Sequence, residues 1–250
     1  MSATFEAPLR IAMWSGPRNI STAMMRAWEN RGDCAVSDEP LYAAYLAATG
    51  LDHPMREEVI AAGDTDWRSV VRALTGPVPD AKPVWYQKHM SHHLLPSMDV
   101  DWIAGLANVL LIRDPRDVVA SYLKARATVT ARDIGLPQQI ELFERLGDAG
   151  TPPPVIDSSD FLRAPEAFLR ALCERFGIAF EERMLHWPAG PRASDGAWAP
   201  HWYAQVRRST GFEAPRERDN VALPPEGERV VAECAPLYER LHARRMQVTG

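Results

Sequence analysis

One stretch near the start of the chain decides the fold, and it is LRIAMWSGPRNIST over residues 9–22. Its first part, Leu9–Trp14, is an apolar run with the length of a buried β-strand, and Ser15–Pro17 is typical of a turn. From Ser21 to Asn30 the apolar residues recur at helical spacing. The order of strand, turn and helix predicts the first unit of an α/β fold.

The rest of the chain repeats this alternation. Further β-like runs occur at Cys34–Val36, Val84–Gln87, Val109–Ile112 and Val155–Ile156. Helical patterns occur at Pro115–Ala131, Pro137–Leu146, Pro165–Phe176 and Glu226–Met246. Strands that alternate with helices predict a central parallel sheet covered on both faces, a three-layer α/β/α arrangement. Composition does not change at the turn-rich connectors, so we expect one domain over residues 1–250.

The composition excludes several function classes. The 250 residues are 46% hydrophobic and 24% charged, which is the mix of a globular protein with a proper core. The net charge of −5 argues against nucleic-acid partners, because phosphate backbones select for excess Lys and Arg. No apolar run is long enough for a membrane span and no leader pattern is present, so a cytoplasmic location is expected.

The loop after the first predicted strand has the properties of an anion site. Backbone N–H groups and the helix dipole converge where a strand leads into a helix. Gly16 permits a close approach, Arg18 supplies a cation, and Ser21 and Thr22 supply hydroxyl donors. The loop matches neither the Walker A pattern nor Gly-x-Gly-x-x-Gly. The alternative is an ordinary turn in which the Ser and Thr cap the helix.

A second motif follows about 100 residues later, with the sequence VLLIRDPRDVVASY over residues 109–122. Arg113 stands at the carboxyl end of a predicted strand, the edge where ligands bind in open α/β sheets. Asp114 and Pro115 are good helix-start residues, and Ser121 follows Arg113 by two helical turns. An arginine fork and a hydroxyl can then meet one dianion. The alternative is a strand-to-helix corner with a surface arginine.

Together the two motifs resemble those of the sulfotransferases. Arg18–Thr22 is similar to the family's 5′-phosphosulfate loop, with Ile20 where Gly is usual, and Arg113 and Ser121 resemble its 3′-phosphate site. The similarity extends from about residue 10 to residue 180 and includes 157–178. It implies a P-loop NTPase-like sulfotransferase fold and 3′-phosphoadenosine-5′-phosphosulfate (PAPS) as donor. The nucleotide-binding residues it implies are Gly16, Pro17, Arg18, Asn19, Ile20, Ser21, Thr22, Arg113, Ser121 and Arg208.

The resemblance also implies the reaction, which moves a sulfuryl group from PAPS to a hydroxyl or amine of a small molecule or sugar, without a metal. Glu39 is the first candidate base, because it follows the strand Cys34–Val36 as a Glu does in carbohydrate-acting sulfotransferases. The alternative is that Asp38 and Glu39 only cap a helix starting at Pro40.

His89 is the rival base. The strand Val84–His89 ends in Lys-His, which is similar to the Lys-x-His of cytosolic sulfotransferases but one residue shorter. Lys88 is a candidate cation near the transferring group. His92 and His93 complete a His-x-x-His-His cluster, whose spacing on a short loop is unfavourable for a metal.

For the far end of the nucleotide, the family uses a basic loop near the C-terminus, and Arg207–Phe212 with Arg208 is the candidate. Trp198 and Trp202 would lie near the adenine or the acceptor. A helix end closed by Gly211 with solvent-facing arginines is the alternative. Two other functions stay open, an ATP-dependent phosphotransferase and a non-catalytic nucleotide-binding module that Ile20 favours. The expected partners are the nucleotide and a small-molecule acceptor, and a homodimer is a common state for such domains.

Overall fold

The computed structural model describes residues 7–215 and 222–248. Its centre is a parallel sheet with the strand order β2-β3-β1-β4-β5. The strands are β1 Leu9–Ser15, β2 Cys34–Asp38, β3 Val84–Met90, β4 Ala107–Ile112 and β5 Val155–Asp157. Each contains the run that the sequence marks as β-like, and the parallel sheet is confirmed.

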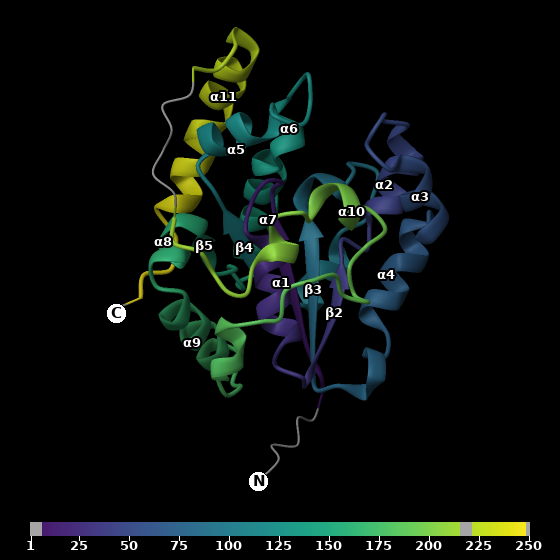
Figure 1. Cartoon of the computed structure of the whole chain (residues 1–250), viewed down its shortest axis with the longest axis vertical. Helices are drawn as coiled ribbons and strands as arrows, with labels where there is room; N and C mark the ends of the chain where they lie inside the picture. The colour runs from purple at the N-terminus through teal and green to yellow at the C-terminus, as the bar shows by residue number, and fades with distance from the viewer. Residues whose placement is uncertain (1–6, 216–221, 249–250) are drawn as a thin grey trace.

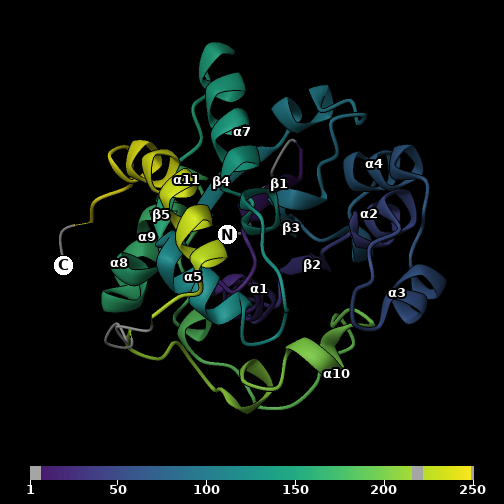
Figure 2. The same cartoon turned by 90° about the horizontal axis from the view of Figure 1, so that it is seen from above.

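Helices cover both faces of this sheet, and Figure 2 shows α1 on one side of it and α7 on the other. The helices are α1 Ser21–Glu29, α2 Tyr42–Thr49, α3 Arg56–Ala62, α4 Trp67–Thr75, α5 Pro115–Tyr122, α6 Ala131–Ile134, α7 Leu136–Asp148, α8 Ser158–Arg163, α9 Pro165–Arg175, α10 Ala199–Trp202 and α11 Pro225–His242. Short 3-10 helices lie at Pro79–Ala81, Ser91–His93, Asp101–Gly105, Glu182–Leu185 and Val206–Arg208. The expected three layers are therefore present.

The first strand shows why its sequence is continuously apolar. Side chains alternate across a strand, so Ile11 and Met13 pack into the core under α1 and α9. Ala12 and Trp14 pack into the opposite core, with residues of α5, α7 and α11. All four are fully buried, because a central parallel strand meets helices on both faces.

Two predicted helices are shorter than expected. The helix predicted over Pro115–Ala131 ends at Tyr122, because Thr130 starts a separate helix, α6, with a capping box. The Thr130 hydroxyl accepts from the Asp133 N–H, and the Asp133 carboxylate accepts from the Thr130 N–H. The helix predicted over Glu226–Met246 ends at His242, where the chain turns toward the sheet.

That turn joins the end of the described chain to the outer edge of β5. The Met246 N–H donates to the Val155 carbonyl oxygen at 2.7 Å, and Arg245 forms an isolated parallel bridge with Val155. This backbone pairing competes with further helix and explains why α11 stops early. Figure 1 shows the segment after α11 running down beside α8 and β5.

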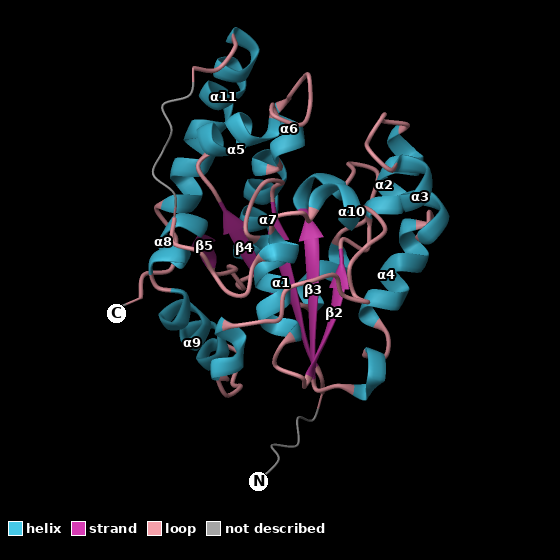
Figure 3. Ribbon diagram, in the orientation of Figure 1, coloured by secondary structure: helices cyan, strands magenta, loops and turns pink. Residues whose placement is uncertain are grey.

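The site lies where the chain reverses direction along the sheet. From β1 the chain passes to β2 on one side, and from β4 it passes to β5 on the other. The carboxyl ends of these two neighbouring strands lie at the top of Figures 1 and 3, and residues of the loops after them line a crevice there. Within the described ranges, no helix is both long and apolar enough to cross a membrane.

Candidate active site

The loop after β1 is fixed by its own polar groups. The Asn19 side chain accepts from the Ile20 N–H at 2.8 Å and donates to the Leu111 carbonyl of β4 at 3.1 Å. A Cβ on Gly16 would lie 2.1 Å from the Ile134 carbonyl oxygen, so the glycine is required by the turn between α6 and α7. The loop is therefore tied to β4 and to α6.

The backbone of this loop accommodates the isoleucine that departs from the family pattern. Ile20 has φ −84° and ψ 15°, a conformation open to any L-residue. The positive φ of the loop, 55°, falls on Arg18 instead. Ile20 is the N-cap of α1 and provides no side-chain cap, so the Ser and Thr that follow do not act as the N-cap either. The first turn of α1 thus offers backbone N–H groups toward the crevice.

The two sequence motifs meet at this point. Arg18 Nε donates to the Ser121 hydroxyl at 2.9 Å, and Arg113 Nη1 donates to the Arg18 carbonyl oxygen at 2.5 Å. Burial and the neighbouring charge of Arg113 both lower the pKa of Arg18. Two guanidinium groups and a hydroxyl, from segments about 100 residues apart in sequence, therefore lie together. A bound anion would stabilise this cluster of positive charge.

A cavity of about 480 Å³ extends from these groups to the ends of β2 and β3. Its cationic end is lined by Arg18, Ser21, Thr22, Arg113 and Ser121. Its other end is lined by Glu39, Lys88, Tyr42, His53, His92, His93, Trp198, Trp202 and Tyr203. Two of the three candidate catalytic groups, Glu39 and Lys88, thus share one cavity with the candidate phosphate-binding groups.

Glu39 and Lys88 are in direct contact. Lys88 Nζ donates to Glu39 Oε1 at 2.5 Å, to Asp38 Oδ1 at 2.7 Å and to the Tyr203 hydroxyl at 2.7 Å. Asp38 and Lys88 are register partners on β2 and β3, so their side chains share one face of the sheet. The Glu39 N–H donates to the Lys88 carbonyl at 2.9 Å, while a φ of 40° turns its side chain to the same ammonium. The helix-cap alternative is wrong, because α2 begins at Tyr42 with Leu41 as N-cap.

The environment shifts the acid–base properties of this pair. Burial raises the pKa of Glu39, and the charge of Asp38 raises it further, while Lys88 opposes both. Burial lowers the pKa of Lys88, but the charges of Asp38 and Glu39 outweigh it and the net shift is well upward. Lys88 therefore stays an ammonium, and Glu39 has a higher proton affinity than an ordinary carboxylate.

The histidines of the sequence motif take different positions. His89 is 1% exposed, stacks on Trp14 with ring centroids 4.2 Å apart, and is not among the residues that line the cavity. Burial lowers its pKa to about 3. His92 and His93 do line the cavity, next to Tyr42 and Tyr45. Of the two candidate bases, only Glu39 faces the space where an acceptor can bind.

Arg208 does not join the other candidate nucleotide-binding residues. It is exposed and lies in a neighbouring groove with Ser209–Glu213, beside α9. Its neighbours Ser209, Gly211 and Phe212 do reach the cavity, as do Trp198 and Trp202. The residues of the C-terminal loop that could contact the far end of a nucleotide are thus the neighbours of Arg208, and not its guanidinium.

Sequence reasoning missed two members of the site, Asp38 and Tyr203. Tyr203 donates to Asp38 Oδ2 at 2.7 Å and accepts from Trp198 Nε1 at 3.0 Å. Asp38 was visible only as a possible cap, although its place at the end of a parallel strand is itself a signal for function. Tyr203 belongs to a loop with no periodic pattern, so its sequence gives no such signal.

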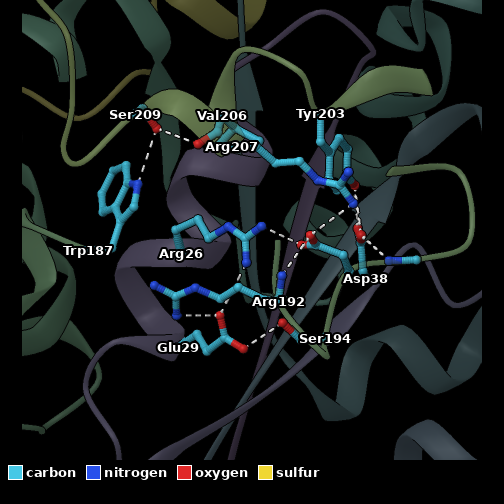
Figure 4. A network of polar contacts seen from close by, with 12 residues as sticks. Arg26, Glu29, Asp38, Trp187, Arg192, Ser194, Tyr203, Val206, Arg207 and Ser209 are labelled. Carbon is cyan, nitrogen blue, oxygen red and sulfur yellow. Dashed lines mark hydrogen bonds and ion pairs between the residues drawn. The ribbon is translucent and has the colours of Figure 1, made fainter. Parts of the chain in front are cut away.

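The segment Trp187–Ser209, which we call the strap, brings Tyr203 to the site. Figure 4 shows the polar network that fastens it to α1. Arg26 of α1 donates to Asp195 at 2.5 Å, with side chains 1% and 3% exposed. Glu29 of α1 accepts from Arg192 at 2.7 Å and from the Ser194 hydroxyl at 2.5 Å. The strap therefore has a fixed position over the carboxyl edge of the sheet.

Fold and site together define an α/β protein of the P-loop-like class with a polar cavity at the switch point of its sheet. The sulfotransferase domain family model matches residues 9–245, and the chain belongs to this family. A sulfotransferase from Alicyclobacillus acidocaldarius has the same fold, with a TM-score of 0.55 over 96% of this chain and 98% of that one, at 13% identity.

Two curated proteins of Arabidopsis thaliana are similar in sequence. The chain is 36% identical to branched-chain-amino-acid aminotransferase-like protein 2 over 231 residues, which are 92% of this chain and 41% of that protein. It is 36% identical to branched-chain-amino-acid aminotransferase-like protein 1 over 237 residues, 94% of this chain and 42% of that protein. The chain thus spans about two fifths of the length of these relatives.

Proposed function

We propose that this protein transfers a sulfuryl group from PAPS to a hydroxyl or amine of a small molecule. The observation that carries the proposal is the continuity of one cavity from the Arg18–Arg113–Ser121 cluster to the Glu39–Lys88 pair. Membership of the sulfotransferase family supports the reaction class. The arrangement of charges supports the assignment of the two ends.

The residues present fit a nucleotide with phosphate at both the 5′ and 3′ positions. Arg18 and Arg113 are close enough for the charge of Arg113 to lower the pKa of Arg18, a repulsion that a bound anion would relieve. Arg113 and Ser121 would hold the 3′-phosphate, and Ser21, Thr22 and the first turn of α1 would hold the 5′-phosphosulfate. The cavity volume is within the usual range for ligand sites.

The chain's own residues then perform the acid–base work. PAPS, when bound, supplies the sulfuryl group. Glu39 accepts the acceptor's proton at its carboxylate, for which its raised pKa suits it. Lys88 holds Glu39 in place through the 2.5 Å contact and keeps positive charge beside the reacting groups. The aromatic rings of the strap, Trp198 and Trp202, line this end of the cavity.

The Lys88 ammonium next to Glu39 at the acceptor end of the cavity is already shared by two carboxylates, those of Asp38 and Glu39. The histidines there are neutral, because burial lowers the pKa of His53 to about 4 and of His92 to about 3. We therefore expect an uncharged acceptor to react better than an anionic one. With 4-ethylphenol and 3-(4-hydroxyphenyl)propionate as a matched pair, the carboxylate should lower kcat/KM by about tenfold or more.

Binding is tested first, by thermal shift. The product nucleotide 3′-phosphoadenosine-5′-phosphate should raise the Tm, and ATP with Mg²⁺ should raise it much less. Arg113→Ala should abolish the shift. Arg145→Ala is the matched control, since this arginine of α7 is half-exposed and pairs with Asp101 at the surface. Equal stabilisation by the two nucleotides, or by neither, would refute the proposal.

Turnover is tested by release of 3′-phosphoadenosine-5′-phosphate from PAPS with a panel of phenols, alcohols, amines and sugars. Glu39→Gln should keep the thermal shift and lower turnover by about 100-fold or more, the usual contribution of a general base. Full turnover by Glu39→Gln would remove Glu39 from the base role.

A further inference from the structure

Two carboxylates share one buried ammonium at the end of β2, and only one of them faces the cavity. The Asp38 side chain is 2% exposed and the Glu39 side chain 11% exposed, against 1% for Lys88. Glu39, Lys88 and Tyr203 line the cavity, whereas Asp38 lies behind them. A group that touches the ammonium but not the cavity does not act on substrate directly.

The hydrogen bonds of Asp38 are all directed at fixing this arrangement. Its carboxylate accepts from Lys88 Nζ at 2.7 Å, from the Tyr203 hydroxyl at 2.7 Å and from the Gly196 N–H of the strap at 3.1 Å. The Tyr203 hydroxyl in turn accepts from Lys88 Nζ at 2.7 Å. Each of the three ammonium hydrogens of Lys88 therefore has one acceptor, on Asp38, Glu39 and Tyr203.

The sharing has a consequence for Glu39. A carboxylate paired alone with a buried ammonium is neutralised by it and loses proton affinity. Because Asp38 takes part of the same positive charge, the group as a whole retains a net charge of −1. Glu39 is the carboxylate of this group that lies next to the cavity. The hydrogen bond between Asp38 and Tyr203 also fixes two of the three acceptors of the Lys88 ammonium, and so its position beside Glu39.

We propose that Asp38 and Tyr203 are positioning residues that set how strongly Glu39 accepts a proton, Asp38 by taking part of the Lys88 ammonium and Tyr203 by holding Lys88 and Asp38 in place. The proposal rests on the role of Glu39 in the proposed function. Tyr203 comes from the strap, and the strap is held by the buried Arg26–Asp195 pair. The base is therefore complete only when the strap is docked on α1.

The two positioning residues act on Glu39 in opposite senses. The charge of Asp38 raises the pKa of Glu39, and the Tyr203 hydroxyl lowers it. The other groups that face Glu39 are Lys88 of β3, which lowers its pKa, and Tyr42 of α2, whose own pKa is raised by burial and by Glu39. Removal of the Asp38 charge should make Glu39 a weaker base, and removal of the Tyr203 hydroxyl a stronger one.

The test is a pH titration of the Glu39 carboxyl carbon by NMR in ¹³C-glutamate-labelled protein, with Glu39→Gln to assign the signal. Asp38→Asn should move the midpoint to lower pH by about one unit, and Tyr203→Phe should move it to higher pH. Arg145→Ala is the control, because this exposed arginine of α7 pairs with Asp101 at the surface and lies outside the strap and the Glu39–Lys88 group. Midpoints unmoved in both variants, or moved in the same direction, would overturn the proposal.

The pH dependence of turnover gives the second measurement. A carboxylate base is active when deprotonated, so the rate rises with pH through its pKa. The rising limb should shift down in Asp38→Asn and up in Tyr203→Phe, with an unchanged thermal shift by 3′-phosphoadenosine-5′-phosphate. The NMR titration needs no turnover, so a wild-type protein that never releases this nucleotide would count against the proposed function alone.

Discussion

At the scale of single residues, two of the five described non-glycine residues with positive φ lie in the site. Arg18 and Glu39 both have positive φ, at 55° and 40°, although neither is glycine. Such a conformation costs about 1–2 kcal/mol for an ordinary L-residue. Surrounding contacts compensate for it, namely the Arg18–Ser121 hydrogen bond and the Glu39–Lys88 backbone and side-chain bonds. Strain of this kind typically persists where it orients a functional side chain.

Ile20→Gly provides a prediction at this scale. Because Ile20 has negative φ and packs partly buried against the core under α1, glycine there gains no conformational benefit. We expect a loss of about 1–2 kcal/mol in the free energy of unfolding, measured in urea, and no gain in affinity for 3′-phosphoadenosine-5′-phosphate. Ile20→Val should lose less. Tighter nucleotide binding by the glycine variant would show that the loop is strained by isoleucine.

At the scale of elements, the strap depends on a few buried charges rather than on regular structure. It contains only the four-residue helix α10 and the 3-10 helix Val206–Arg208. The Arg26–Asp195 pair holds its middle, and the Trp187 indole donates to Ser209 at 3.2 Å to join its ends. The loss of one partner of a buried pair leaves a poorly compensated charge, here Arg26 with only its 3.7 Å contact to Glu29, which is more costly than the loss of a surface pair.

Asp195→Ala should therefore lower the free energy of unfolding by about 3 kcal/mol, measured by urea denaturation. The exposed Arg145–Asp101 pair is the comparison, and Arg145→Ala should cost less than about 1 kcal/mol. Similar losses in the two variants would mean that the strap is held by its apolar contacts instead.

The sequence predicts most of the strands and helices, but it predicts few of the contacts between them. The predicted helices Pro137–Leu146 and Pro165–Phe176 correspond closely to α7 and α9. Helices α3, α4, α8 and α10 were missed, although in α4 Trp67, Val70 and Leu74 have helical spacing and Asp66 is a capping residue. The strand-end residues of the site follow from sequence, because parallel strands end at one edge. Tyr203 does not, because only tertiary packing brings a loop 164 positions away to Glu39.

At the scale of the whole molecule, buried neutral histidines make stability depend on pH. His53, His89, His92 and His93 all have pKa values lowered mainly by burial, to about 4 for His53 and about 3 for His89 and His92. In the unfolded chain these groups titrate near pH 6.5. Their folded pKa is depressed, so the stability they contribute is present above pH 6.5 and is lost as pH falls toward 3.

The free energy of unfolding should therefore fall as pH falls below 6.5, by at most about 1.4 kcal/mol per pH unit for each histidine that stays neutral in the folded protein. His89→Phe keeps a ring against Trp14 and removes the titrating nitrogens. Its stability should fall less steeply between pH 6 and 4, as measured by urea denaturation at a series of pH values. An unchanged slope would show that His89 is already protonated in the folded protein.

The pairing of the chain after α11 with β5 also bears on how separate molecules behave toward one another. The outer edge of β5 would otherwise present unpaired backbone groups, which can recruit a strand from another copy. The Met246–Val155 hydrogen bond and the Arg245 bridge occupy this edge. The loss of these two contacts should cause aggregation more than unfolding. Turbidity should then increase with protein concentration while the sheet of each molecule remains intact.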